Sequence, residues 1–402
     1  MGKDEETEIV IIQSTIFNHL RMLHLKKKIE SIMTSWNNPP FPPLASLLHG
    51  ISIFYGAAQR LRAICYRHQV FPSRELPCKV LSVGNITVGG TGKTPMTIYV
   101  ATKIKRAGFN VVIVSRGYKG GAEKLGGIVS DGRTLYMDAE QAGDEPYMTA
   151  CRLKGVPVVV GKNRFAAGML AISKFQPDVI VLDDAFQHLK LKRDIDLVLL
   201  DYIRPFGNSH LLPRGVLREP VSSLARSTAC ILTRCRTGAD EAPMSSVAEI
   251  QMLLPSIPVF TSSHVPYWYG VPRGEHNSFE AAPDAFSAND IEQIKHHEVF
   301  CFSGIARNDD FQHTVKDLGL KVTGVLEFSD HHPYTDKDLA TILRCAENAG
   351  ADRLITTEKD HARIASKGPL PMELIVVGVK VSFGDNDQEF ISFITNRLQT
   401  EE

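Results

Sequence analysis

One stretch of the chain, Val80–Lys103, constrains the fold more than any other. It opens with a short, mostly apolar run, Val80–Val83, of the kind that forms a buried strand in a parallel sheet. The glycines of Gly89–Gly92 free the following turn to curl tightly and to present backbone N–H groups to an anion. Lys93 and Thr94 then stand at the start of a helix, whose N-terminus also attracts negative charge. The stretch therefore predicts a loop that binds the phosphates of a nucleoside triphosphate.

This predicted loop departs from the usual pattern, G-x-x-x-x-G-K-S/T, at Thr87, where glycine is expected. The pair Gly89-Gly90 restores the freedom of the turn. In such loops the lysine reaches the β- and γ-phosphates, and the hydroxyl group after it binds Mg²⁺. The alternative is a glycine-rich turn without function, which the strand–loop–helix context disfavours. The residues assigned to nucleotide binding are Thr87, Val88, Gly89, Gly90, Thr91, Gly92, Lys93 and Thr94.

Length and composition place the chain among ordinary globular proteins. Its 402 residues allow one large or two ordinary domains, and its 43% hydrophobic and 22% charged residues are typical of a soluble protein with a packed core. The formal net charge of zero argues against nucleic-acid binding driven by overall charge. Seven scattered cysteines without a C-x-x-C pair predict free thiols in a reducing cytoplasm.

Segments with strand and helix patterns alternate along most of the chain, which predicts parallel sheets covered by helices. We expect the α/β class, with a P-loop NTPase-like α/β/α domain and a smaller C-terminal α/β domain. Residues 1–33 open with an acidic run unlike a secretory or mitochondrial leader, and are expected to be poorly structured or an additional helix. The other predicted divisions are the P-loop core over 34–262, a linker or hairpin over 263–297 and the smaller domain over 298–402.

A helix is predicted over Leu44–His68, because apolar residues recur there at helical spacing. Its C-terminal part is basic, with Arg60, Arg62 and Arg67. No uninterrupted apolar run reaches the ~20 residues that a membrane span needs. A broad apolar face with a basic end fits contact with a membrane interface, and it equally fits packing on the protein's own core. The pattern by itself leaves both possibilities open.

Two adjacent carboxylates, Asp183 and Asp184, end the apolar run Val179–Leu182. Ligands of parallel sheets bind at the carboxyl ends of strands, and carboxylate oxygens suit a Mg²⁺–nucleotide site. The pair is therefore expected to hold Mg²⁺, although aspartate is also common where a strand ends in a polar turn. Gln187 and His188 follow at the same end of this strand.

Several other polar residues have a structural explanation as well as a functional one. Asp144 precedes a helical stretch and, taken alone, is best explained as an N-cap. Arg218 could stabilise phosphoryl charge or form a surface salt bridge. The pair His331-His332 suggests a metal site, but no third ligand stands at suitable spacing, which disfavours zinc. The stretch Thr356–Asp360 is only faintly similar to the guanine-reading motif of GTPases, so a GTPase is disfavoured.

Taken together, these stretches resemble the tetraacyldisaccharide 4′-kinase family, the lipid A 4′-kinases of Gram-negative bacteria. The resemblance runs from Trp36 to the C-terminus, and the family's phosphate loop also carries threonine in the first glycine position. Asn308–Asp310 depart from the family pattern, as does the acidic extension before Met33. The stretches that carry the resemblance are Ser82–Pro95, Ser115–Tyr118, Gly143–Pro146, Gly161–Arg164, Asp183–His188, Leu211–Pro220, Gly304–Arg307, Asp330–His332 and Thr357–Asp360.

The resemblance implies ATP-dependent phosphorylation of the 4′-hydroxyl group of tetraacyldisaccharide 1-phosphate, which gives the lipid A precursor. It implies ATP and Mg²⁺ as cofactors and a lipid substrate embedded in the membrane, with no nucleic acid and no obligatory protein partner. The enzyme would then sit on the cytoplasmic face of the bacterial inner membrane as a peripheral or monotopic protein. That location favours membrane contact for the helix over 44–68.

The resemblance also implies roles for individual residues. Asp144 would be the catalytic base, paired with His331 of the second domain, because a carboxylate oriented by an imidazole can accept the proton of a sugar hydroxyl group. Closure of the two domains would assemble the site and exclude water. The remaining assignments are Lys93 and Arg218 to catalysis, Gln187 and His188 to the nucleotide, Thr94, Asp183, Asp184 and Glu219 to Mg²⁺, and Arg116 and Arg164 to substrate. Which of Arg116, Arg164 and Arg218 binds the substrate 1-phosphate and which the transferred phosphate stays open.

Two other functions stay open on the sequence: a P-loop NTPase that acts as a switch or chaperone, and a soluble kinase of a small metabolite. A switch would hydrolyse nucleotide when a protein partner stimulates it, whereas a kinase hydrolyses little until its acceptor is present. A small-metabolite kinase would act without detergent or membrane and would not use the apolar face of the helix over 44–68.

Overall fold

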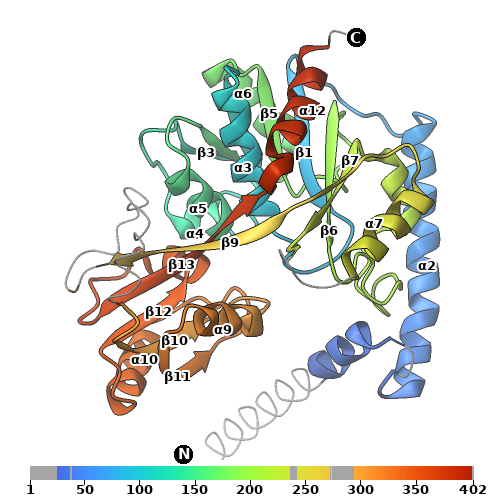
Figure 1. The fold of residues 1–402 in the computed structure, drawn as a ribbon. Helices are drawn as coiled ribbons and strands as arrows, with labels where there is room; N and C mark the ends of the chain where they lie inside the picture. The colour runs from blue at the N-terminus through green and yellow to red at the C-terminus, as the bar shows by residue number, and fades with distance from the viewer. Residues whose placement is uncertain (1–24, 37–38, 236–241, 272, 274–293, 401–402) are drawn as a thin grey trace, which may run out of the picture.

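The computed structural model describes residues 25–36, 39–235, 242–271, 273 and 294–400, which form two sheets with flanking helices (Figure 1). The first sheet has eight strands and is parallel except at its β3 edge. Its spatial order is β3 (Gly127–Ser130), β4 (Val158–Val160), β2 (Val111–Ser115), β5 (Val179–Asp183), β1 (Lys79–Asn85), β6 (Ile195–Asp201), β7 (Ala229–Thr233) and β8 (Val259–Thr261). The second sheet has five strands, in the order β11 (Lys321–Glu327), β10 (Glu298–Ser303), β12 (Arg353–Thr357), β13 (Glu373–Ser382) and β9 (Ser263–Val271).

Helices connect these strands, as the predicted α/β class requires. The α-helices are α2 (Pro42–Arg67), α3 (Lys93–Arg106), α4 (Ala139–Ala142), α5 (Asp144–Arg152), α6 (Arg164–Phe175), α7 (Ala242–Leu253), α9 (Asn308–Asp317), α10 (Asp336–Asn348), α11 (Glu358–Ile364) and α12 (Asp387–Gln399). Residues 25–34 are also helical, and 3₁₀ turns cover Val221–Arg226 and Gly384–Asn386. Each of the seven cysteines is a free thiol.

Strand β1 lies at the centre of the first sheet, between β5 and β6, and its side chains alternate between two buried faces. Leu81 and Val83 belong to the cluster that α3 and α12 cover, whereas Val80 belongs to the cluster under α6. Apolar residues on both faces are expected for a central parallel strand. The parallel register pairs Val83 with Asp183, so the end of β5 lies beside the loop that follows β1.

Strand β9 occupies the first part of the segment 263–297, for which a linker or hairpin is predicted. It pairs antiparallel with β13 along its whole length and forms the edge of the second sheet. Tyr267, Tyr269 and Val271 alternate along it and are buried in the core of that sheet, which is why the segment is a strand. Most of the remaining part of the predicted linker, 272 and 274–293, lies outside the described residues.

The smaller domain predicted over residues 298–402 does not include all of that range, because helix α12 packs on the first sheet. Its buried residues Phe390, Ile394 and Leu398 follow helical spacing and join the cluster that contains α3. The Asp387 carboxylate accepts hydrogen bonds from Tyr99 and Lys103 of α3. Figure 1 shows β9 and the end of β13 running between the two sheets, so the chain crosses from one to the other twice.

Helix α2 packs on the protein with its small side chains, and its large apolar side chains face outward. Its buried residues are Ala45, Leu48, Ser52 and Gly56. A Cβ atom added at Gly56 would lie 2.6 Å from Leu211 Cδ1, so the backbone approaches the neighbouring loop closely there. The exposed large apolar residues are Leu47, Ile51, Ile53, Phe54, Leu61 and Ile64. Of the two possibilities left open by the sequence, packing on the protein's own core therefore holds for Leu48 and not for these exposed residues. In the described part of the chain no helix is both long and apolar enough to cross a membrane.

The helix over residues 25–34 docks on the start of α2. Ile32 is buried against Ala45 and Leu48. The guanidinium group of Arg214 donates a hydrogen bond of 2.9 Å to the Ile32 carbonyl oxygen, and the Asn208 amide donates one to the Ser35 carbonyl oxygen. Residues 1–24 of the predicted N-terminal extension lie outside the described residues, whereas residues 25–33 belong to a packed helix.

We expect Phe390→Ala to lower the free energy of unfolding by about 3–5 kcal/mol, because it removes a fully buried ring and leaves a cavity. The Phe390 ring stacks on Phe383 with a centroid distance of 4.0 Å, so α12 would also lose its anchor. Urea denaturation followed by circular dichroism measures the change. Gln399→Ala, at an exposed position on the same helix, is the control and should change the free energy by less than about 0.5 kcal/mol. Equal stability of the two variants would contradict the packing of α12 described above.

Candidate active site

The conformation of the loop after β1, at the N-terminus of α3, is fixed by its glycines and by hydrogen bonds. Gly92 caps α3 with a φ of 82°, a left-handed conformation that favours glycine. The Asn85 amide donates to Thr91 Oγ1 at 2.9 Å, and Thr233 Oγ1 donates to the Thr91 carbonyl oxygen at 3.1 Å. A third contact comes from Arg234, whose guanidinium group donates to the Gly90 carbonyl oxygen. The free N–H groups of the first turn of α3 therefore face the same space as the loop.

Lys93 and Arg218 meet on the carboxylate group of Asp184. Lys93 Nζ lies 3.8 Å from Asp184 Oδ1, and Arg218 Nη1 lies 3.1 Å from both carboxylate oxygens. Asp184 directly follows β5 and has a φ of 50°. The parallel register of β1 and β5 places Asp184 beside the loop that carries Lys93.

Asp183 is a buried carboxylate without a cationic partner of its own among the described residues. Thr97 Oγ1 donates to it at 3.1 Å. Burial and the negative charges of Glu145 and Asp184 raise the pKa of Asp183 to about 7. This surplus of negative charge suits a divalent cation, and oxygen donors are the ligands that Mg²⁺ prefers. Within the described residues no group of three or more His, Cys, Asp and Glu side chains forms a metal site alone. Thr94, Asp183 and Asp184 thus fit a cation that phosphate oxygens help to hold.

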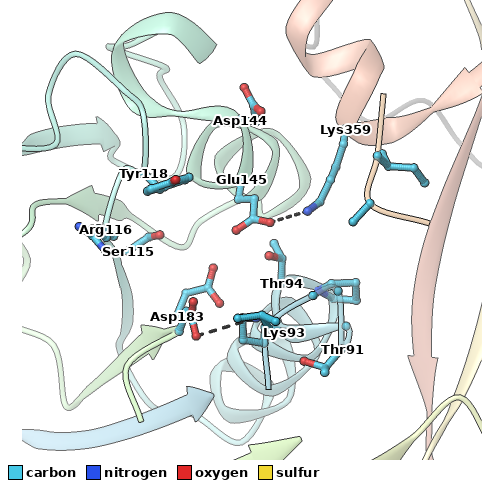
Figure 2. A pocket seen from close by; sticks show the side chains of 18 of the residues that line it. Thr91, Lys93, Thr94, Ser115, Arg116, Tyr118, Asp144, Glu145, Asp183 and Lys359 are labelled. Atoms are coloured by element: carbon cyan, nitrogen blue, oxygen red, sulfur yellow. Dashed lines mark hydrogen bonds and ion pairs between the residues drawn. The ribbon is translucent and has the colours of Figure 1, made fainter. Parts of the chain in front are cut away.

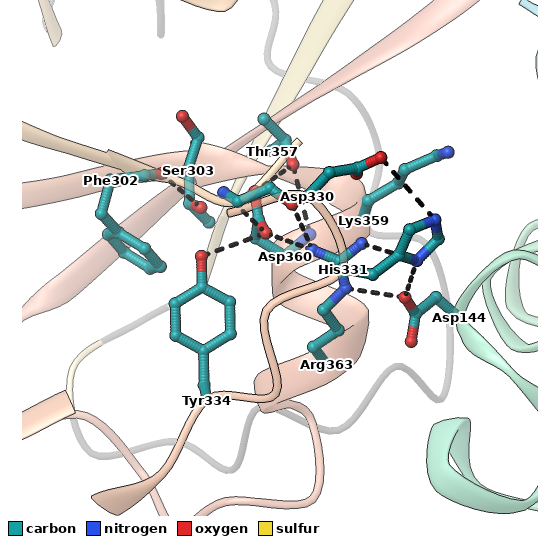
Figure 3. Close-up of polar contacts among 12 residues, drawn as sticks. Asp144, Phe302, Ser303, Asp330, His331, Tyr334, Thr357, Lys359, Asp360 and Arg363 are labelled. Atoms are coloured by element: carbon teal, nitrogen blue, oxygen red, sulfur yellow. Dashed lines mark hydrogen bonds and ion pairs between the residues drawn. The ribbon is translucent and has the colours of Figure 1, made fainter. Parts of the chain in front are cut away.

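Asp144 is the first residue of α5 and does not act as its N-cap. The N-cap residue is Gly143, and the Asp144 side chain instead reaches the second sheet. Its Oδ2 atom lies 2.9 Å from Nδ1 of His331 and 2.7 Å from Nε of Arg363 (Figure 3). Burial alone would raise the pKa of Asp144, but the contacts with His331 and Arg363 hold it below its ordinary value. The structural explanation favoured by the sequence alone is therefore wrong.

The next residue, Glu145, forms a second ion pair between the sheets. Its carboxylate binds Lys359 Nζ, and Figure 2 shows both side chains above Lys93 and Thr94. The Lys359 ammonium group lowers the pKa of Glu145 to about 2. Two adjacent carboxylates of α5 are thus bound by three side chains that follow strands of the second sheet, those of His331, Lys359 and Arg363.

A cavity of about 2100 Å³ lies between the two sheets and is lined by both. It exceeds the ~300–1,000 Å³ of most ligand pockets, so it has room for more than one substrate. The predicted residues that line it are Val88, Gly89, Gly90, Thr91, Gly92, Lys93, Thr94, Arg116, Asp144, Arg164, Asp183, Asp184, Gln187, His188, Arg218 and His331.

Four of these lining residues have protein contacts that restrict them. Gln187 Nε2 donates to the Asn85 carbonyl oxygen at 2.7 Å. Burial lowers the pKa of His188 to about 4, so its imidazole is neutral. Arg116 binds Glu123 at 2.7 Å. Arg164 is buried, with its Nε atom unpartnered among the described residues, and burial lowers its pKa to about 10.

Comparison with known proteins identifies relatives along nearly the whole chain. The sequence profile of the family described as Tetraacyldisaccharide-1-P 4'-kinase matches residues 44–399. The tetraacyldisaccharide 4'-kinase of Desulfatibacillum aliphaticivorans is 38% identical over 384 residues, which are 94% of this chain and 99% of the relative. That of Pelobacter propionicus is 41% identical over 325 residues, 81% of this chain and 84% of the relative. The chain belongs to the tetraacyldisaccharide 4′-kinase family.

A solved structure agrees with this membership. LpxK from Aquifex aeolicus, described as an "apo" form in complex with ATP, is 30% identical, with a TM-score of 0.67 over 88% of this chain and 99% of that chain. The predicted resemblance, the P-loop NTPase-like fold and the enzyme class, a phosphotransferase with an alcohol group as acceptor, are therefore confirmed.

Two of the predicted site residues, one assigned from the family and one from the loop pattern, do not line the cavity. Glu219, assigned to Mg²⁺, is buried and pairs with Arg226 at 2.8 Å. Thr87, assigned to the nucleotide, forms a β-bridge with Leu217 and is buried as well. Glu219 Oε1 has no hydrogen-bond partner among the described residues.

The sequence analysis gave no role to four charged residues at this site: Glu145, Arg234, Lys359 and Arg363. Glu145 and Lys359 stand inside stretches that carry the family resemblance, so those stretches were the available signal. Arg234 and Arg363 had none, because their partners lie far away in the chain. Arg234 also binds Asp201 at 2.9 Å. Asp201 in turn binds Arg307, which lies in the loop after β10 of the second sheet.

We expect Arg234→Ala to weaken ATP binding about tenfold, because a charged hydrogen bond that shapes the phosphate loop is lost. Isothermal titration calorimetry with ATP measures the affinity. Arg204→Ala removes an exposed arginine after the neighbouring strand β6 and should leave the affinity unchanged. Unchanged affinity in Arg234→Ala would show that the loop keeps its shape without this contact.

Proposed function

We propose that this chain transfers the γ-phosphoryl group of ATP to the 4′-hydroxyl group of tetraacyldisaccharide 1-phosphate, which gives the lipid A precursor. The observation that carries the proposal is that the phosphate loop and the Asp144–His331 pair line one cavity. Nucleotide and acceptor groups can therefore meet there. Family membership supplies the substrate class, and the cavity has the room that a nucleotide and a disaccharide require.

The nucleotide side of the reaction belongs to the loop after β1. Its backbone N–H groups and the N-terminus of α3 would bind phosphate oxygens, and Lys93 would move from Asp184 to the β- and γ-phosphates. Thr94, Asp183 and Asp184 would hold Mg²⁺, which neutralises charge on the transferred phosphoryl group when it is bound. Arg218 already stands beside Asp184 and would stabilise the same charge.

The acceptor side belongs to Asp144. As the 4′-oxygen forms its bond to the γ-phosphorus and the bond to the β-phosphate oxygen breaks, the hydroxyl proton passes to the Asp144 carboxylate and ADP leaves. His331 orients that carboxylate through Oδ2. Arg116 and Arg164 are proposed to bind substrate phosphate, and Arg164 has an unpartnered Nε atom inside the cavity wall.

We also propose that α2 places the protein on the cytoplasmic face of the inner membrane as a peripheral protein. Its outward apolar face ends in exposed Arg60 and Arg67, which suit anionic head groups. The same helix lines the cavity through Tyr55, Gln59 and Arg62. Tyr55 OH donates to the Arg218 carbonyl oxygen at 2.7 Å, and Arg62 donates to the Gln187 carbonyl oxygen at 2.8 Å. A lipid substrate would therefore enter beside the helix that contacts the membrane.

The full chain, incubated with ATP, Mg²⁺ and tetraacyldisaccharide 1-phosphate in detergent, should form the 4′-phosphorylated product. Asp144→Ala should lower kcat by about 10²–10⁴-fold, because the proton acceptor is lost, while ATP affinity stays unchanged. Mass spectrometry of the lipid measures the product. Glu140→Ala, an exposed acidic position on α4, is the control.

Failure of the folded, ATP-binding chain to phosphorylate the lipid would overturn the proposed function. ATP hydrolysis that a protein partner stimulates would then favour the NTPase switch. Phosphorylation of a water-soluble sugar without detergent would favour the small-metabolite kinase.

We expect Phe54→Glu to reduce binding to vesicles that contain anionic lipid about tenfold or more, because it places a charge on the outward face of α2. The Phe54 side chain is 79% exposed, so the substitution leaves the core intact. Leu125→Glu, at an exposed apolar position outside α2, is the matched control and should bind as the unmodified chain does. Co-sedimentation with vesicles measures binding, and equal binding of the two variants would contradict the role of α2.

A further inference from the structure

The guanidinium group of Arg363, on α11, joins the two sheets at Asp144. Its Nε atom donates to Asp144 Oδ2 at 2.7 Å. Its Nη1 atom donates to the Gly304 carbonyl oxygen at 2.7 Å and to Asp360 Oδ1 at 2.8 Å. The side chain is only 5% exposed. Its Nη2 atom lies 3.4 Å from His331 Nδ1. Arg363 therefore connects Asp144 of α5 to three residues on the side of the second sheet, in directions that a planar guanidinium group can reach and an ammonium group cannot reach with the same geometry.

Asp360 fixes this guanidinium group within the second sheet. Its carboxylate is fully buried and accepts hydrogen bonds from the Gly304 amide, from Tyr334 OH and from Thr357 Oγ1 (Figure 3). Each of these groups comes from a different segment of the second sheet or its loops. The buried Asp360 carboxylate and its hydrogen-bond partners thus hold Arg363 in place from the side of the second sheet, separately from Asp144.

His331 and Arg363 bind the same oxygen atom of Asp144. Both contacts are to Oδ2, and among the described residues Oδ1 has no hydrogen-bond partner. Asp144 lines the cavity, so Oδ1 is available to a group that enters it. A carboxylate held through one oxygen keeps the other in a defined direction.

We propose that Arg363 is the positioning residue of Asp144: together with His331 it occupies Oδ2 and thereby reserves Oδ1 for the acceptor hydroxyl group. The inference rests on the proposed role of Asp144 as the base. It adds that the second sheet supplies a guanidinium group, besides the imidazole, for that role. Asp144 lies on α5, beside the first sheet, and Arg363 lies on α11, beside the second. Asp144 is therefore correctly oriented only when the two sheets are together.

Removal of Arg363 should change the pH dependence of the reaction, because burial then acts on Asp144 with less opposing positive charge. Burial raises the pKa of Asp144, and His331 and Arg363 lower it. Without Arg363 the pKa of Asp144 rises, so the acidic limb of the pH profile moves to higher pH. The other charged and titratable groups that face this corner are Glu145 and Tyr118 from the first sheet, and Asp330, His331 and Lys359 from the second.

The test compares Arg363→Met and Arg363→Lys with the unmodified chain in the detergent assay, over pH 5–9. We expect Arg363→Met to lower kcat about 100-fold, to leave the KM for ATP within about twofold, and to move the acidic limb up by about one pH unit. Arg363→Lys should keep the limb near its original place, because charge is retained, and should recover only part of kcat, because the fork geometry is lost. Arg344→Met, at an exposed position on α10, is the control and should change none of these.

The outcomes separate this inference from the proposed function. Full activity in Asp144→Asn would overturn the role of Asp144 and the inference with it. An inactive Asp144→Asn together with an unmoved acidic limb in Arg363→Met would overturn the inference alone. Should Arg363→Met fail to fold, which circular dichroism and ATP binding would reveal, unchanged kcat in Arg363→Lys would overturn it.

Discussion

The site depends on charge compensation between two sheets. Asp144 and Glu145 are adjacent at the start of α5. Their negative charges are balanced by Arg363 and Lys359 from the second sheet, and His331 Nδ1 also contacts Asp144. Partly buried carboxylates are costly without such partners, so separating the two sheets would leave Asp144 and Glu145 without them. The same contacts orient Asp144 and close one side of the cavity. Stability of the interface and geometry of the reaction thus rest on the same ion pairs.

The chain connects the two sheets in a way that lets them act on each other. Strand β9 leaves the first sheet directly after β8 and forms the edge of the second, and α12 returns from β13 to pack on α3. Helix α3 begins with Lys93, so the terminal helix of the chain packs on the helix that follows the phosphate loop. Asp201, at the end of β6, binds both Arg234 behind that loop and Arg307 of the second sheet. A change in the relative position of the two sheets would therefore affect the phosphate loop through α12 and α3, and through Asp201 and Arg234.

Helix α2 presents different side chains to the protein and to the outside. Small residues at helical spacing, Ala45, Ser52 and Gly56, allow close approach to the body of the protein. The larger apolar residues are then left on the outside, where burial in a lipid interface would stabilise them. Helix α2 also bonds to loops at the cavity through Tyr55 and Arg62, so the proposed membrane contact and the cavity would share one element.

The sequence by itself determined the local parts of the site. The phosphate loop and the pair Asp183-Asp184 could be predicted because each is a short segment whose pattern contains its own physical reason, and the parallel strands β1 and β5 bring the segments together. Only the tertiary structure decided which charges meet across the sheets, because the partners Asp144 and Arg363 lie 219 positions apart in the chain. It also decided that Glu219 is bound by Arg226 away from the cavity and that the apolar face of α2 points outward. Periodicity defines the faces of a helix, but which face packs on the protein depends on the shape of the surface that meets it.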